Sequence, residues 1–239
     1  MDSSPLLYDT LQIAEATAIQ RTLRDRLEQS TTHVKLKTIA GADISLNRFS
    51  ETIYAGLVVL SYDTLQPISY SLVQSKTSFP YVPGYLAFRE VPALMEALAQ
   101  MDEKPDAIVV DGHGIAHPRR MGIAAHLGAL IDIPTMGCAK KKLYGKYKEP
   151  GIEKGAYTAL TASDNEVMGY VLRTKSNVKP VYISPGNHIS LAQCLAIAGH
   201  CTRGYRLPEP TRKAHEFVNL FRTGQLKAGY YRVPQSSLF

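Results

Sequence analysis

Three strand-like segments in a row, separated only by short polar connections, are the feature that most constrains the fold of this chain. Residues 38–44 and 52–61 are apolar and rich in β-branched side chains, and residues 68–73 alternate between apolar and polar. Sequential strands with short connections pair as an antiparallel meander. A helical stripe over 86–101 and a short apolar run at 107–110 come next, and such a run is typical of a buried parallel strand.

The rest of the chain continues with alternating helices and strands. They are expected at 124–130, 133–138, 167–173, 180–183, 189–201 and 210–221. Pro92 lies within the first long helical stripe, where it either occupies the first turn or kinks the helix. We expect residues 1–239 to form one domain, with an amphipathic helix in 1–30 and a loose tail over 222–239.

The composition is compatible with a globular protein that meets an anionic partner. Hydrophobic residues make up 45% of the chain and charged residues 20%, which excludes disorder, collagen-like and coiled-coil architectures. Lys and Arg number 27 against 21 Asp and Glu. The net charge of +6 makes nucleic acid a candidate partner without requiring it.

Cysteine usage and hydropathy predict where the protein works. Cys138, Cys194 and Cys201 form no CxxC pair, and their odd number argues for a reducing compartment. The start of the chain, MDSSPLLYDT, lacks the basic and apolar parts of a signal peptide. No apolar stretch approaches the roughly 18 residues that a membrane span needs. We therefore expect a cytoplasmic protein without a membrane partner. Separately, we expect a monomer.

Three carboxylates have positions that favour a shared site. Asp43 lies at the end of the first expected strand, Asp111 directly follows the fourth, and Glu90 lies on the helix between them. A meander followed by a helix and a parallel strand places strands one and four side by side, so their carboxyl ends meet at one edge. This arrangement is ribonuclease-H-like: an α/β fold whose mixed sheet has three antiparallel strands and then parallel strands, flanked by helices.

Clustered carboxylates suit Mg²⁺, which takes oxygen ligands, lowers the pKa of an attacking water and stabilises charge on a phosphate. Taken singly, each acid has a simpler interpretation. Asp43 could cap a strand-to-loop turn, Glu90 could be a solvated helix residue, and Asp111 before glycine could form a turn.

Several long motifs resemble those of the endonuclease V family, in the ribonuclease-H-like superfamily. They are GADIS at 41–45, PYVPGYLAFRE at 80–90, DGHGIAHPRRMGIAAHLG at 111–128, PTMGCAKKKL at 134–143 and GYRLPEPTRKAH at 204–215. The resemblance implies a DNA-repair endonuclease that recognises deoxyinosine, the product of adenine deamination. It implies hydrolysis of the second phosphodiester bond 3′ to the lesion, leaving 3′-OH and 5′-phosphate, with Mg²⁺ or, in its place, Mn²⁺.

The resemblance also implies roles for individual residues. The metal ligands would be Asp43, Glu90 and Asp111, and His215 would complete the catalytic site. Lys140 would contact the scissile phosphate or orient the attacking water. Without the motif, His215 would be interpreted as a surface histidine on a helix.

Lesion recognition is implied for two further segments. Tyr81 would be an aromatic wedge that fills the gap left by an extruded base, with Pro80 and Pro83 stiffening its turn; the simpler interpretation is a packed loop tyrosine. The substrate-binding set is Tyr81, Pro80, Pro83, Gly84, Gly112, Gly114, His117, Gly122 and Lys140. Backbone N–H groups of the glycine-rich loop would read hypoxanthine, because glycine permits close approach.

Other interpretations stay open. Zinc binding by His113, His117 and His126 lacks a thiolate pair, and Pro118 interrupts the helix that HxxxH spacing needs. The basic region, Arg119, Arg120, Lys140–Lys142, Lys146 and Lys148 with interleaved Tyr144 and Tyr147, is either a phosphate-tracking groove or a solubilising loop. Alternatives to the DNA enzyme are an inosine-specific endoribonuclease, another ribonuclease-H-like nuclease, or a nucleic-acid-binding module without catalysis.

Overall fold

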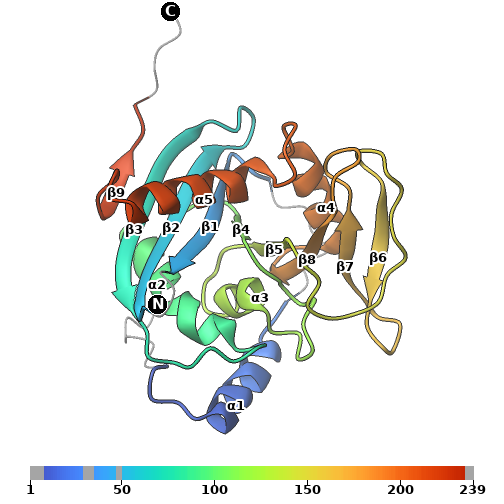
Figure 1. Cartoon of the computed structure of the whole chain (residues 1–239), viewed down its shortest axis with the longest axis horizontal. Coiled ribbons are helices and arrows are strands. Elements are labelled where there is room, and N and C mark those ends of the chain that lie inside the picture. The colour runs from blue at the N-terminus through green and yellow to red at the C-terminus, as the bar shows by residue number, and fades with distance from the viewer. Residues whose placement is uncertain (1–7, 29–34, 47–49, 235–239) are drawn as a thin grey trace, which may run out of the picture.

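A single mixed sheet organises the computed structural model, which describes residues 8–28, 35–46 and 50–234 (Figure 1). Within these residues nine strands follow one another across the sheet in the order β6-β7-β8-β5-β4-β1-β2-β3-β9. Their bounds are β1 Thr38–Leu46, β2 Thr52–Ser61, β3 Pro67–Lys76, β4 Ile108–Val110, β5 Thr135–Ala139, β6 Tyr157–Thr161, β7 Val167–Leu172, β8 Val181–Asn187 and β9 Gly229–Arg232. The helices are α1 Ile13–Arg24, α2 Leu86–Ala99, α3 Ile123–Gly128, α4 Leu191–His200 and α5 Glu209–Arg222.

The pairing of the strands confirms the expected meander and the parallel strands beside it. β1 pairs antiparallel with β2, and β2 with β3. β4 lies parallel to β1 and to β5 on its other side. The α/β, ribonuclease-H-like arrangement predicted from the order of elements is therefore present. Beyond β5 the sheet returns to antiparallel pairing through β8, β7 and β6.

Helices cover both faces of the sheet, and the alternation of side chains along β1 separates the two cores. Ala40 and Ala42 pack in a cluster with apolar residues of α2 and α3. Ile39, on the opposite face, shares a cluster with residues of α4 and with Ala214 of α5. Figure 1 shows α5 crossing one face of β1, β2 and β3, with α2 on the other side. Side chains of β1 therefore contact both layers.

Backbone contact at a glycine brings α5 unusually close to β1. A Cβ atom at Gly41 would lie 1.8 Å from the carbonyl oxygen of Pro210, in the first turn of α5. Only glycine permits such an approach of two backbones. The start of α5 is thereby fixed over the middle of β1, two residues from Asp43.

Three expectations about the ends and interiors of elements need revision. Pro92 lies inside α2 beyond its first turn, so the first-turn alternative is excluded. The loose tail expected over 222–239 is wrong for part of its length, because β9 pairs with β3 and Tyr231 stacks on Tyr70 at 5.2 Å. An unpaired edge of β3 offers backbone partners that a short aromatic segment can use. Strand β6 has no counterpart among the strands expected from the sequence.

Some expectations fall outside the described residues. The helix expected within 1–30 is seen as α1, while residues 1–7 and 29–30 of that range are not described, nor are 235–239 of the tail. In the described part of the chain, no helix is both long and apolar enough to span a bilayer.

Candidate active site

Asp43 and Asp111 lie side by side where the parallel pairing of β1 and β4 ends. The parallel pairing of β1 with β4 ends at Ala42 opposite Val110. The backbone N–H of Asp111 donates to the carbonyl oxygen of Ala42 at 3.0 Å. Each aspartate is thus the next residue after the paired segment, although β1 itself continues to Leu46. The predicted meeting of the two acids at one edge is therefore observed.

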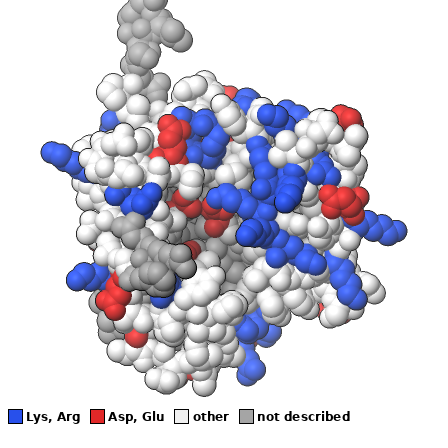
Figure 2. Space-filling view, in the orientation of Figure 1, with Lys and Arg blue, Asp and Glu red and all other residues white. Residues whose placement is uncertain are grey.

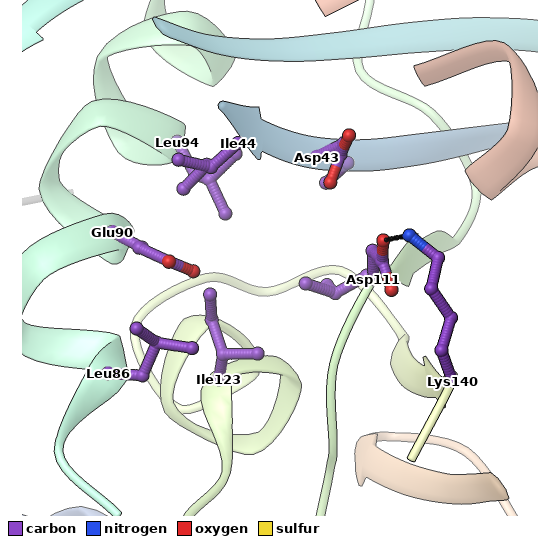
Figure 3. Close-up of a pocket in the computed structure, with 10 residues that line it drawn as sticks. Asp43, Ile44, Leu86, Glu90, Leu94, Asp111, Ile123 and Lys140 are labelled. Carbon is purple, nitrogen blue, oxygen red and sulfur yellow. Dashed lines mark hydrogen bonds and ion pairs between the residues drawn. The ribbon is translucent and has the colours of Figure 1, made fainter. Parts of the chain in front are cut away.

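Glu90 faces the two aspartates across a pocket. The pocket has a volume of about 240 Å³ and is lined by Ala42, Asp43, Ile44, Leu86, Glu90, Leu94, Val110, Asp111, Ile123 and Lys140. Figure 3 shows the Glu90 side chain reaching from α2 toward the wall formed by Asp43 and Asp111. The structure therefore brings the three predicted acids and Lys140 together.

Each aspartate has a cationic or imidazole partner. His215 Nδ1 lies 2.9 Å from Oδ2 of Asp43 and donates to it. This hydrogen bond raises the pKa of His215 above its usual range, against the effect of burial. Lys140 Nζ donates to Oδ2 of Asp111, drawn as a dashed line in Figure 3. His215 and Lys140 are therefore each held against one of the two aspartates.

Negative charge is concentrated in this pocket. Burial, together with the charges of Asp43 and Asp111, raises the pKa of Glu90 to about 8. Burial and Asp43 also raise the pKa of Asp111, while Lys140 opposes the rise. A cation would relieve this repulsion, and a hard divalent cation takes oxygen ligands. The carboxylates are thus the kind of ligand that such an ion takes. Within the described residues, however, no group of three His, Cys, Asp or Glu side chains is arranged so that it could hold a metal ion.

Tyr81 projects from the turn between β3 and α2. Its side chain is 72% exposed. Pro80 and Pro83 flank it, and Gly84 follows with φ of +84°, a conformation that suits glycine. The carbonyl oxygen of Gly84 accepts from Nε2 of His117 at 3.1 Å. The two segments assigned to lesion recognition are therefore in direct contact.

The glycines of the 111–122 loop are used inside the protein. Gly112 N–H donates to the carbonyl of Val110 at 2.8 Å, Gly114 N–H to Ser184 Oγ at 2.9 Å, and Gly122 N–H to the carbonyl of Gly114 at 3.0 Å. The expectation that these N–H groups face a base is therefore not met in this arrangement. A Cβ at Gly114 would lie 1.9 Å from the Pro185 carbonyl oxygen, so close packing requires glycine here.

The histidines of this loop are neutral and structurally engaged. Burial, reinforced by Arg119, lowers the pKa of His117 to about 4, and burial lowers that of His113. His113 Nε2 donates to the carbonyl of Lys141 at 2.9 Å, and His126 Nε2 lies 3.0 Å from the hydroxyl of Tyr8. These separate partners argue against a shared zinc site.

Two kinds of residue were missed by the sequence analysis. Leu86 and Ile123, the first residues of α2 and α3, form an apolar wall of the pocket below Glu90 (Figure 3). The sequence signal that could have found them is their position shortly after Gly84 and Gly122, where a helix begins. Arg206 Nη2 donates to the carbonyl of Lys140 at 2.6 Å and to that of Pro180 at 2.8 Å. No sequence pattern links Arg206 to Lys140.

A basic surface borders the acids. In Figure 2, acidic atoms lie in a hollow near the middle of the face shown, with Lys and Arg gathered to their right. Of the predicted basic region, Lys141, Lys142, Lys146 and Lys148 are exposed. The two arginines serve the fold instead: Arg119 stacks on the ring of Tyr85 at 4.2 Å, and Arg120 pairs with Glu166.

The chain is similar to proteins of one kind over most of its length. The family model described as Endonuclease V matches residues 21–216. An Endonuclease V of Roseiflexus sp. (strain RS-1) is 44% identical over 202 residues, which are 84% of this chain and 90% of the relative. The crystal structure of Endonuclease V from Streptomyces avermitilis superposes with a TM-score of 0.85 at 36% identity, covering 91% of this chain and 96% of that one. That of Ciona intestinalis Endonuclease V, in complex with a DNA containing an inosine followed by a ribo-adenosine, has a TM-score of 0.79 at 28% identity, covering 90% and 99%.

Proposed function

The chain belongs to the endonuclease V family of DNA-repair nucleases, and we propose that this member recognises deoxyinosine in DNA. It hydrolyses the second phosphodiester bond 3′ to the lesion and leaves 3′-OH and 5′-phosphate ends. The observation that carries the proposal is the pocket in which Asp43, Glu90 and Asp111 converge beside Lys140. The buried, free cysteines fit a reducing compartment, and we propose a cytoplasmic monomer.

Asp43, Glu90 and Asp111 would hold Mg²⁺, with Mn²⁺ able to replace it. Support comes from the carboxylate chemistry of the pocket and from the raised pKa of Glu90, which a nearby cation would lower. When bound, the ion lowers the pKa of an attacking water and stabilises charge on the phosphate.

Lys140 and His215 act on either side of the acids. The ammonium of Lys140, which pairs with Asp111, would contact the scissile phosphate or orient the attacking water. His215 fixes the carboxylate of Asp43 through its hydrogen bond. The carbonyl of Lys140 is itself held by Arg206, so the backbone below the ammonium is fixed.

Lesion recognition combines an extruded base with a stacking side chain. Deoxyinosine pairs weakly, so its extrusion costs less than that of a normal base. Tyr81 would stack in the vacated space, which is worth about 1–3 kcal/mol by analogy with base–aromatic stacking. Hypoxanthine would enter the region formed by the loop of Gly112, Gly114, His117 and Gly122. Because the N–H groups of these glycines are occupied, we assign them a packing role.

The experiment is cleavage of an end-labelled duplex that contains one inosine, with the cut mapped to the nucleotide. A matched duplex with adenine at the same position is the control. We expect a cut at the second phosphodiester bond 3′ to inosine, dependent on Mg²⁺ or Mn²⁺, and little cutting of the adenine duplex. Equal cutting of both duplexes would indicate another ribonuclease-H-like nuclease, and binding without cutting would indicate a binding module.

Inosine-containing RNA is the second candidate substrate. The Ciona intestinalis relative is in complex with a strand in which a ribo-adenosine follows the inosine. A third arm of the assay therefore uses the same sequence as RNA. Faster cleavage of the RNA than of the DNA would favour the endoribonuclease.

A further inference from the structure

The turn that carries Tyr81 is fixed from outside the catalytic core. We call residues 77–84 the Tyr81 turn; it leads from β3 into α2. Tyr81 is exposed, but Phe79 and Tyr85 on either side of it are buried. The groups that hold this turn at its two ends come largely from residues 8–24, which we call the N-terminal segment.

Asp9 holds the first end of the Tyr81 turn. Its Oδ1 accepts from three groups in succession: Thr77 Oγ1 at 3.1 Å, the Ser78 N–H at 2.9 Å and the Phe79 N–H at 3.1 Å. From the other side Arg89, the neighbour of Glu90, donates to the carbonyl of Phe79. The backbone is therefore fixed two residues before Tyr81.

Gln20 of α1 holds the second end. Its side chain is buried, and Nε2 donates to the carbonyl of Gly84 at 3.0 Å. Its Oε1 accepts from Nε of Arg119 at 2.5 Å. Arg119 Nη2 and His117 Nε2 donate to the same Gly84 carbonyl at 2.8 and 3.1 Å. One amide thus ties α1, the Tyr81 turn and the glycine-rich loop together.

An apolar cluster lies between the two polar anchors. Tyr8 and Ala16 of the N-terminal segment pack with Phe79, Tyr85 and Phe88, and the cluster also contacts Val82, Leu11 and Ile19. Tyr85 is linked to α1 again through its hydroxyl, 2.7 Å from Thr17 Oγ1. The residues on both sides of Tyr81 are thus fastened to the N-terminal segment, while the Tyr81 ring itself projects.

We infer that the N-terminal segment is a brace that holds Tyr81 in position for insertion into the DNA stack, with Asp9 and Gln20 as positioning residues. The inference rests on the proposed role of Tyr81 as a wedge. A side chain that must enter a base stack binds more tightly when its backbone is already ordered, because less entropy is lost on binding. Most of the segment, including both positioning residues, precedes the part matched by the family model, residues 21–216.

The test compares inosine cleavage in duplex and in single-stranded DNA for Asp9→Ala, Gln20→Ala and Tyr81→Ala. A wedge matters only where a stack must be filled, so a loosened turn reduces the duplex rate more than the single-strand rate. We expect the ratio of the two rates to fall on the order of tenfold in each variant, since misplacing a group by about 1 Å has effects of this size or larger. Rates are read well below the melting temperature of each variant.

Three further variants separate positioning from stability. Asp9→Asn keeps an oxygen that accepts the N–H groups and is expected to restore the ratio. Gln20→Glu keeps the contact with Arg119 but cannot donate to Gly84, and it is expected to behave like Gln20→Ala. Asp25→Ala removes an exposed carboxylate that follows α1 and pairs with Arg24; it is the matched control and is expected to keep the ratio.

The double variant Gln20→Ala with Tyr81→Ala is expected to have the same ratio as Tyr81→Ala, because the brace acts through that side chain. The brace is overturned if Asp9→Ala and Gln20→Ala slow both substrates equally while Tyr81→Ala is selective for duplex. If Tyr81→Ala itself slows both equally, it is the proposed wedge that fails.

Discussion

His215 on α5 and Asp43 on β1 are joined by a hydrogen bond of 2.9 Å across 172 residues of sequence. The bond joins a helix on one face of the sheet to the strand that carries a proposed catalytic carboxylate. It orients that carboxylate and raises the pKa of the imidazole. Replacing either residue therefore removes this hydrogen bond, but we expect the two replacements to slow cleavage to different degrees.

Loss of an acid is expected to abolish cleavage without unfolding the protein. Asp43→Ala or Asp111→Ala removes an oxygen ligand and the associated stabilisation of charge, which is worth several kcal/mol. We expect the single-turnover rate on inosine duplex to fall about a thousandfold or more. The melting temperature is measured in parallel. Near-normal turnover of either variant in Mg²⁺ would show that the site is misassigned.

His215→Ala is expected to be less severe than Asp43→Ala. The variant loses the group that orients Asp43 but keeps the carboxylate, so we expect the rate to fall about ten- to a hundredfold. His215→Gln retains a donor for Asp43 and is expected to recover part of the rate. Equal effects of His215→Ala and Asp43→Ala would argue that the imidazole takes part directly in the chemistry.

Affinity for DNA is expected to fall steeply with salt, because Lys and Arg displace condensed counterions. Lys146→Ala and Lys148→Ala remove exposed charges of the predicted basic region, and each is expected to reduce the salt slope by roughly one unit for every phosphate that the lysine neutralises. Filter binding or anisotropy at several salt concentrations measures the slope. Arg120→Ala is the comparison, since that guanidinium pairs with Glu166 and its removal is expected to change the slope less. A slope that no lysine variant alters would place the groove elsewhere.

Removal of the exposed aromatic ring is expected to be selective for duplex DNA. Tyr81→Ala removes stacking worth about 1–3 kcal/mol, which corresponds to roughly ten- to a hundredfold in binding and cleavage of inosine duplex. Tyr81→Phe keeps the ring and is expected to stay close to the original. The two variants are compared by anisotropy and by cleavage rate on duplex and single strand.

Acid is expected to destabilise the protein through its buried histidines. Burial lowers the pKa of His126 from 6.5 to about 3. Below the unfolded pKa the unfolded chain binds a proton that the folded chain excludes, so stability falls as pH decreases from 6.5 toward 3. His126→Gln is expected to make the slope of unfolding free energy shallower by up to about 1.4 kcal/mol per pH unit. Tyr8→Phe, which keeps the imidazole, should retain the original slope in urea titrations between those limits.

The central part of the fold could be predicted because its strands bury most of their residues. β2 and β4 leave continuous apolar runs, and those runs define the meander and the parallel strand. β6 and β9 lie at the edges of the sheet, where β6 buries only Leu160 and β9 buries no residue. Edge strands with so few buried side chains carry no period-two pattern, so nothing in the sequence distinguished them from loops.

The candidate site could likewise be predicted only in part from the sequence. Asp43 and Asp111 could be placed because each comes next to the segment over which β1 and β4 pair in parallel, although β1 continues beyond Asp43. His215 could not be placed by periodicity, because a helix residue on the surface has the same pattern whether or not it contacts a distant carboxylate. The contact of Gln20 with Gly84 was hidden for a similar reason: a polar contact between remote segments leaves no repeating pattern in either.

The close approach of β1 and α5 at Gly41 couples the packing of that helix to the candidate active site. A methyl group at that position would act as a spacer between strand and helix. It would tilt or lift α5 and so lengthen the reach from His215 to Asp43, with neither residue altered. The contact between Asp43 and His215 thus depends on a side chain that is absent two residues away, and because a Cβ there would meet backbone atoms of α5, even alanine would disturb it without any change to the two contacting residues.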